Sequence, residues 1–113
     1  MTDLQTVVEL DSFIRRAKSI MPDTEREAIV NFIAANPEAG VSLGGGLRKV
    51  RFARTGSGKS GGYRTIYVYG GDTIPLFLIT VFAKNEKDNL SPTERAIMVQ
   101  TSKTLLATYG ARQ

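Results

Sequence analysis

The fold is decided by residues 47–83, LRKVRFARTGSGKSGGYRTIYVYGGDTIPLFLITVFA, which hold three stretches with the composition of β-strands. Residues 47–52 alternate between the two faces of an extended chain, and residues 63–69 are rich in aromatic and β-branched side chains. Residues 74–83 are apolar on both parities apart from Thr80, which is typical of a central strand covered on both faces. Because the connections are short, we predict an antiparallel meander.

The N-terminal third predicts a short strand followed by a pair of helices. Residues 5–10 have strand composition and lead to Asp11, a typical N-cap residue. Apolar residues then recur at helical spacing until Pro22 interrupts them. Thr24 opens a capping-box pattern, and the second apolar stripe ends at Asn36-Pro37. We therefore expect two short antiparallel helices.

The C-terminal third predicts one long helix. Ser91 is suited to the N-cap, Pro92 to the first helical position and Glu94 to the third, and the helix should run to about Tyr109. The glycine-rich residues 40–46 predict a loop. The expected fold is α+β in one domain over residues 1–113, with the order β-α-α-β-β-β-α, an antiparallel sheet and the helices gathered on one face.

Composition narrows the chemistry. The chain has 113 residues, of which 42% are apolar, and it contains neither Cys nor His. A disulfide framework, a zinc-thiolate site, a thiol nucleophile and an imidazole acid or base are all excluded, so we expect no cofactor and no metal. The first residues have neither a basic nor an apolar leader pattern, and no apolar run has the length of a membrane span. A cytoplasmic protein without membrane contact is expected.

Charge is segregated along the chain. Residues 39–71 carry six basic residues and no acidic residue, whereas residues 1–38 have a net charge of −3. A cationic stretch without counter-charges is suited to a polyanionic partner such as nucleic acid. A solvated basic surface explains the charge alone equally well.

One motif in this stretch is misleading. Residues 56–60, GSGKS, resemble the end of a phosphate-binding P-loop, but Ala53 stands where that motif requires Gly. A strand follows Ser60, whereas a P-loop leads into a helix. We therefore interpret the segment as a hairpin loop in which Lys59 closes over a bound polyanion.

The predicted strands bring several cations together. Lys49 and Arg51 project from one face of the first strand, about 7 Å apart, roughly the spacing of successive phosphates. Pairing of the hairpin brings Arg64 close to them, and Lys84 and Lys87 leave the end of the third strand. Each cation taken singly is more typical of a solvated surface charge than of a catalytic group. Their convergence favours a phosphate-binding face.

Three blocks of this sequence resemble the RelE/ParE toxin superfamily, most closely its HigB-like branch. The blocks are residues 46–54, 61–69 and 81–94, and AKNEKDNLS within the last is the most specific part. The resemblance implies a ribosome-dependent endoribonuclease that cuts mRNA in the decoding site. It also implies a cognate antitoxin, usually a HigA-like helix-turn-helix protein that represses the operon, so that operator DNA is contacted only through the antitoxin.

Carried over by position, the resemblance assigns catalytic roles to Lys49, Arg51 and Arg64, with Lys84 in the neighbourhood of a further arginine. The C-terminal tyrosine of RelE-like enzymes has no counterpart, because its place falls near residues 90–91. Further RNA contacts are expected from Arg48, Arg54, Lys59, Tyr67 and Lys87.

Cutting RNA without metal or His requires activation of a 2′-OH, stabilisation of the phosphate and protonation of the leaving 5′-oxygen. Arg51 and Arg64 are suited to the phosphate, and Lys49 or Lys84, surrounded by other cations, to the base. Tyr67 and Glu86 are weaker candidates for acid or base, and the shared parity of Tyr67 with the neighbouring tyrosines favours sheet packing over base stacking. The alternatives are a ParE-like inhibitor of DNA gyrase and a non-catalytic RNA-binding module.

Overall fold

The computed structural model describes residues 5–53, 62–87 and 89–110. The α+β class is confirmed, and the order contains one strand more than predicted. The GSGKS segment, Arg54 and Lys59 lie outside the described residues. Within the described ranges, none of the helices has the length and apolarity that crossing a bilayer requires. In chain order the elements are β1 (Val7–Glu9), α1 (Asp11–Ile20), α2 (Asp23–Ala35), β2 (Val41–Gly44), β3 (Leu47–Phe52), β4 (Tyr63–Val68), β5 (Leu76–Ala83) and α3 (Pro92–Gly110).

The sheet has five strands in the order β1-β5-β4-β3-β2. Strands β2 to β5 form the predicted antiparallel meander, but β1 joins β5 in parallel, with Val7 opposite Leu76. The sheet is therefore mixed, and the prediction of an antiparallel sheet was wrong for this one edge. The first strand has this place because the meander leaves the outer edge of β5 open, where the N–H of Leu76 donates to the carbonyl of Thr6 (2.8 Å).

Strand β2 occupies the segment for which the sequence predicted a loop. Val41 lies opposite Lys49 and Ser42 opposite Arg48, so the segment adds a further antiparallel strand beside β3. Glycine is depleted in strands, so four glycines in seven residues led to the prediction of a loop instead of a strand. The glycines serve the turn instead: Gly46 has a φ of +90°, and a Cβ atom there would lie 2.5 Å from Cδ1 of Leu106.

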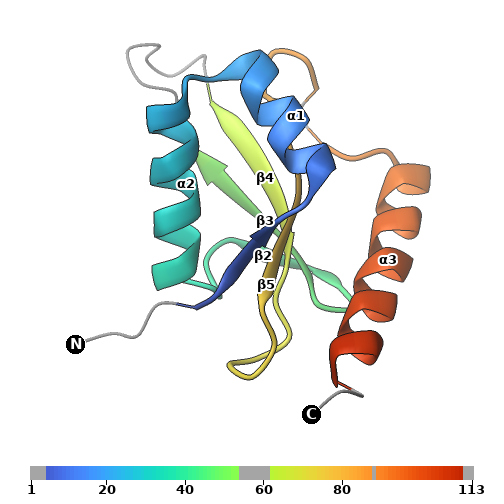
Figure 1. Ribbon diagram of the computed structural model, residues 1–113. Coiled ribbons are helices and arrows are strands. Elements are labelled where there is room, and N and C mark those ends of the chain that lie inside the picture. The colour runs from blue at the N-terminus through green and yellow to red at the C-terminus, as the bar shows by residue number, and fades with distance from the viewer. Residues whose placement is uncertain (1–4, 54–61, 88, 111–113) are drawn as a thin grey trace.

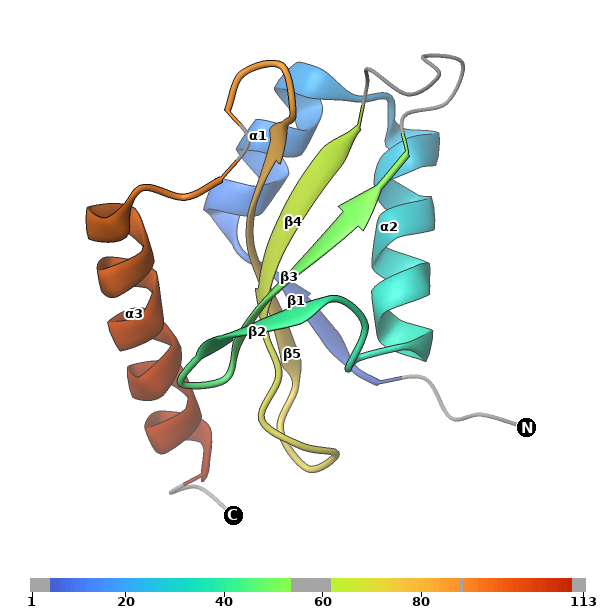
Figure 2. The same cartoon turned by 180° about the vertical axis from the view of Figure 1, so that it is seen from behind.

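The helices cover both faces of the sheet. Figures 1 and 2 show α1 and α2 together on one face, here called the helix-pair face, and α3 on the other, the α3 face. The prediction that all helices gather on one face was wrong. Its physical reason is β5, which is buried on both faces as predicted: it sends Leu76, Leu78 and Val81 to the helix-pair face and Phe77, Ile79 and Phe82 to the α3 face.

The helix ends confirm one predicted cap and correct two. At α3, the N–H of Glu94 donates to Oγ of Ser91 (3.1 Å) and the N–H of Ser91 donates to Oε1 of Glu94 (2.9 Å), which is the predicted capping box. Helix α1 begins at Asp11 itself, and α2 begins one residue before Thr24. Neither of these two helices has a side-chain capping hydrogen bond, so Asp11 and Thr24 are not caps.

Candidate active site

Two arginines face each other across neighbouring strands. Arg51 of β3 lies directly opposite Arg64 of β4, and Lys49 lies opposite Ile66, two residues further along the same face. Ile66 belongs to the core under α3, so these three cations project on the α3 face. Like charges directly opposite each other destabilise a sheet, and an anion between them removes the repulsion.

The three cations differ in how firmly they are held. Arg64 is only 5% exposed, whereas Arg51 is exposed and makes no hydrogen bond or ion pair with any described residue. Lys49 is half-buried, and its Nζ donates to Oδ1 of Asn89 (2.9 Å). Sequence reasoning missed Asn89, because the contact spans 40 residues and no local pattern indicates it.

The turn after β5 brings two more cations to this end of the sheet. The N–H of Lys84 donates to the carbonyl of Gly62 (2.9 Å), which places Lys84 beside the start of β4. Nζ of Lys87 lies 5.1 Å from the ring centroid of Phe82, and Phe82 is the strand partner of Arg64. Lys49, Arg51, Arg64, Lys84 and Lys87 are here called the cation cluster; strand pairing places the first three on one face, and the turn places the backbone of Lys84 and the Nζ of Lys87 beside the start of β4 and its neighbour Phe82.

Two carboxylates fix the same turn. Lys87 donates to Glu94 (2.5 Å), and the N–H of Ser91 donates to the same carboxylate. These two hydrogen bonds, the one from Lys87 first, lower the pKa of Glu94 to about 2. Arg16 donates to Oε1 of Glu86 (2.7 Å), which lowers the pKa of that carboxyl. Both groups are ionised at neutral pH, so neither carries a proton to donate.

Two residues predicted to contact RNA lie on the helix-pair face instead. The guanidinium of Arg48 donates to the carbonyls of residues 38–40 at 2.6–3.3 Å. Tyr67 is wholly buried, and its hydroxyl lies within hydrogen-bonding distance of the carbonyls of Pro37 (2.9 Å) and Ala39 (2.6 Å). Burial raises the pKa of Tyr67. Both side chains support the turn after α2, and the burial of Tyr67 agrees with packing rather than base stacking.

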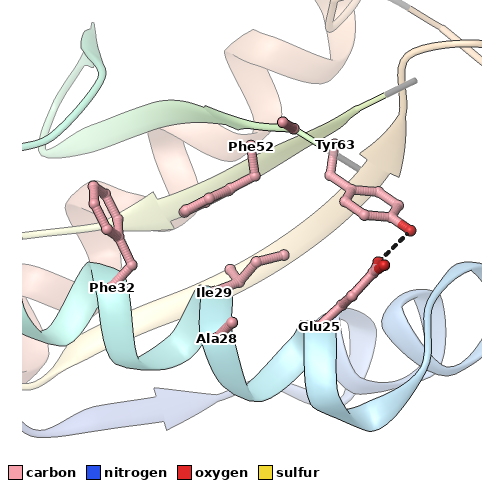
Figure 3. Close-up of a pocket in the computed structure, with 7 residues that line it drawn as sticks. Glu25, Ala28, Ile29, Phe32, Phe52 and Tyr63 are labelled. Atoms are coloured by element: carbon pink, nitrogen blue, oxygen red, sulfur yellow. Dashed lines mark hydrogen bonds between the residues drawn. The ribbon is translucent and has the colours of Figure 1, made fainter. Parts of the chain in front are cut away.

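A pocket of about 260 Å³ on the helix-pair face is separate from the cation cluster. Figure 3 shows Phe32 and Ile29 of α2 facing Phe52 and Tyr63 of the sheet, with the Tyr63 hydroxyl donating to Glu25 (2.7 Å). The lining is largely apolar and includes no Lys or Arg. It therefore lacks the chemistry that a phosphate requires.

The arrangement on the α3 face is suited to holding a phosphate between guanidinium groups with amines nearby. Among the described residues, no group of three His, Cys, Asp or Glu side chains is placed to hold a metal ion. The sequence model of the family described as the RelE toxin of the RelE / RelB toxin-antitoxin system matches residues 7–112. The match spans all the strands that carry the cation cluster.

Proposed function

We propose that this chain, which belongs to the RelE toxin family, is an endoribonuclease that cuts mRNA on the ribosome and so stops translation. Membership makes the chain the toxin of a toxin–antitoxin pair. The observation that carries the nuclease proposal is the opposed pair Arg51 and Arg64, surrounded by the other members of the cation cluster. A guanidinium stays charged and grips two phosphate oxygens, and a buried one acts in a medium of low dielectric.

The reaction needs only the RNA's own 2′-oxygen as nucleophile. That oxygen attacks the adjacent phosphorus, the bond from phosphorus to the 5′-oxygen breaks, and the products carry a 2′,3′-cyclic phosphate and a 5′-hydroxyl. Arg51 and Arg64 hold the non-bridging oxygens as negative charge grows on them. The phosphate arrives between side chains that the sheet register has already placed, so little reorganisation is needed.

Two proton transfers complete the reaction. We assign the proton of the 2′-OH to Lys49, whose side chain lies on the same face as Arg51 and whose Nζ is positioned by its hydrogen bond to Oδ1 of Asn89. The exposed ammonium of Lys84, beside the start of β4, is suited to protonate the departing 5′-oxygen. Metal-independent cleavage follows from this division of roles.

The partners of the proposal are the ribosome, mRNA and a HigA-like helix-turn-helix antitoxin in the cytoplasm. Operator DNA is reached only through the antitoxin. Support comes from family membership, which requires an antitoxin, and from the block AKNEKDNLS, which resembles the HigB-like branch. Co-expression of the neighbouring open reading frame should restore growth, and the absence of such a gene would contradict this partner.

The nuclease proposal is tested by incubating the purified chain with translating ribosomes and mapping new mRNA 5′ ends. Arg64→Ala and Arg51→Ala should each lower the cleavage rate by about 100-fold, the usual effect of removing one group that stabilises a developing oxyanion. Lys103→Ala removes the same charge within α3, beside the turn at Gly45, and should leave the rate unchanged. Circular dichroism checks that each variant is folded.

Three outcomes would contradict the proposal. Intact mRNA together with gyrase-dependent DNA breaks would indicate a ParE-like toxin. Binding without cutting, weakened only modestly and in a salt-dependent way in Arg51→Ala, would indicate an RNA-binding module. Equal rates for Arg51→Ala and Lys103→Ala would remove the cation cluster from the chemistry.

A further inference from the structure

A cleft adjoins the cation cluster on the α3 face. It has a volume of about 360 Å³, within the range of small-ligand sites, and it is shared by α1, β5, the following turn and α3. Lys87 belongs to both the cleft and the cation cluster, and Phe82 joins them because it is the strand partner of Arg64. We call it the Thr80 cleft; its lining residues are Arg16, Thr80, Phe82, Glu86, Lys87 and Met98, with Glu94 at the start of α3.

The two cations that line the Thr80 cleft are both paired with carboxylates, whereas Arg51 of the cation cluster forms no ion pair with a described residue. Glu86 is paired with Arg16 at 2.7 Å and Glu94 with Lys87 at 2.5 Å. Each cation of the cleft therefore already has its own anion. A phosphate gains little there, so the cleft is suited to an uncharged part of a nucleotide.

Two polar atoms in the cleft have no partner within the described part of the chain. Thr80 is the only polar residue of β5, it is half-buried, and its hydroxyl makes no hydrogen bond with a described residue. Oε1 of Glu86 accepts both from Arg16 and from the N–H of Ala83, which leaves Oε2 without a partner there. Thr80 is half-buried and the Glu86 side chain is 43% exposed, so both atoms are open to the cleft, where the edge of a ligand can form hydrogen bonds with them.

The remaining lining is apolar. Met98 is half-buried, and Phe82 lies beneath the Nζ atom of Lys87, which is 5.1 Å from the ring centroid. A planar group with apolar faces and polar edges matches this combination, because its faces would contact the apolar lining residues Phe82 and Met98 while its edge would meet Thr80 and Glu86. A nucleobase taken out of its stack has this character.

We propose that the Thr80 cleft holds one unstacked base of the mRNA beside the scissile phosphate, with Thr80 and Glu86 reading its edge. The proposal rests on the nuclease function proposed above. A carboxylate only accepts hydrogen bonds, so it favours adenine, cytosine or guanine, whose amino groups donate. Uracil presents two carbonyl oxygens around a single N–H and is disfavoured at this place.

The test maps cleavage on translating ribosomes with messages that carry each of the four bases at each codon position. The wild-type chain should discriminate against uracil at one position, by a factor of about two to ten for one hydrogen bond. Thr80→Val keeps the shape and removes the hydroxyl, and Glu86→Gln supplies a donor as well as an acceptor. Both should reduce the discrimination at that position only, whereas Thr101→Val, on the exposed part of α3, should retain it.

The possible failures are distinguishable. If the wild-type chain cuts no message, the nuclease function fails and the base subsite with it. If it cuts while Thr80→Val and Glu86→Gln keep every base preference, or slow all four bases equally, the subsite alone is overturned. If Thr80→Val does not fold in a melting experiment, Glu86→Gln decides the matter, because that side chain is exposed and lies outside the core.

Discussion

Two arginines three residues apart on β3 differ in how much they contribute to the stability of the folded chain. Arg48 donates to the carbonyls of residues 38–40, whereas Arg51 forms no hydrogen bond or ion pair with a described residue. Arg48→Ala should lower the free energy of unfolding by about 1–2 kcal/mol, because those carbonyls lose their donor. Arg51→Ala should change it by less than about 0.5 kcal/mol. Urea denaturation measures both values, and equal losses would contradict the structural role of Arg48.

The sequence predicts part of this difference. Alternation along residues 47–52 correctly places Lys49 and Arg51 together on one face and Arg48 on the other. It does not indicate which groups pack against each face, because the position of the carbonyls that Arg48 binds depends on the path of the chain after α2. The same holds for Asn89, which reaches Lys49 only when the turn after β5 is folded.

At the scale of elements, the start of α3 is sensitive to acid. The pKa of Glu94 is lowered from 4.5 to about 2, first by Lys87 and then by the N–H of Ser91. A lowered pKa means that the folded chain binds this proton less readily than the unfolded chain, so the stabilisation is present above about pH 4.5 and is lost towards pH 2. Glu94→Gln should lower the melting temperature at neutral pH and leave it nearly unchanged near pH 2. A difference from wild type that is independent of pH would contradict this cap.

Substitutions in the turn between β2 and β3 test how closely α3 packs against the sheet. Gly44 and Gly46 both have positive φ, but only Gly46 lies against the helix, where an added Cβ would meet Leu106 at 2.5 Å. Both alanine variants carry the backbone strain of about 1–3 kcal/mol, and Gly46→Ala should lose more stability than Gly44→Ala. Leu106→Ala should recover part of the difference in a double-mutant cycle. Equal losses of stability in the two alanine variants would contradict close packing of α3 against this turn.

Elements with a strong local pattern were predictable, and those that depend on distant partners were not. The meander, the helix pair and the capping box at Ser91 follow from side-chain alternation, helical spacing and cap chemistry within a few residues. Strand β2 was missed because its glycines suit the turn, while its strand character comes from pairing with β3. The parallel place of β1 was missed because it depends on which edge of β5 the meander leaves open.

At the scale of the whole molecule, the division of the two faces positions the candidate site. Helices α1 and α2 cover the helix-pair face (Figure 1), and α3 meets the hairpin end of β3, where Ser102 donates to the carbonyl of Gly45 (2.7 Å). Arg51 lies towards the opposite end of β3, next to its last residue. The sequence indicated that β5 is covered on both faces, yet it did not indicate which helix covers which face, because that depends on how the chain leaves β5.

The central claim is that the α3 face of the sheet, and no other basic surface, cuts RNA. The most direct measurement is the single-turnover rate of mRNA cleavage on translating ribosomes for Arg51→Ala and Arg48→Ala, two arginines of one strand on opposite faces. We predict a loss of about 100-fold for Arg51→Ala and a nearly unchanged rate for Arg48→Ala below its melting temperature. Equal rates for the two folded variants, or the larger loss in Arg48→Ala, would contradict the claim.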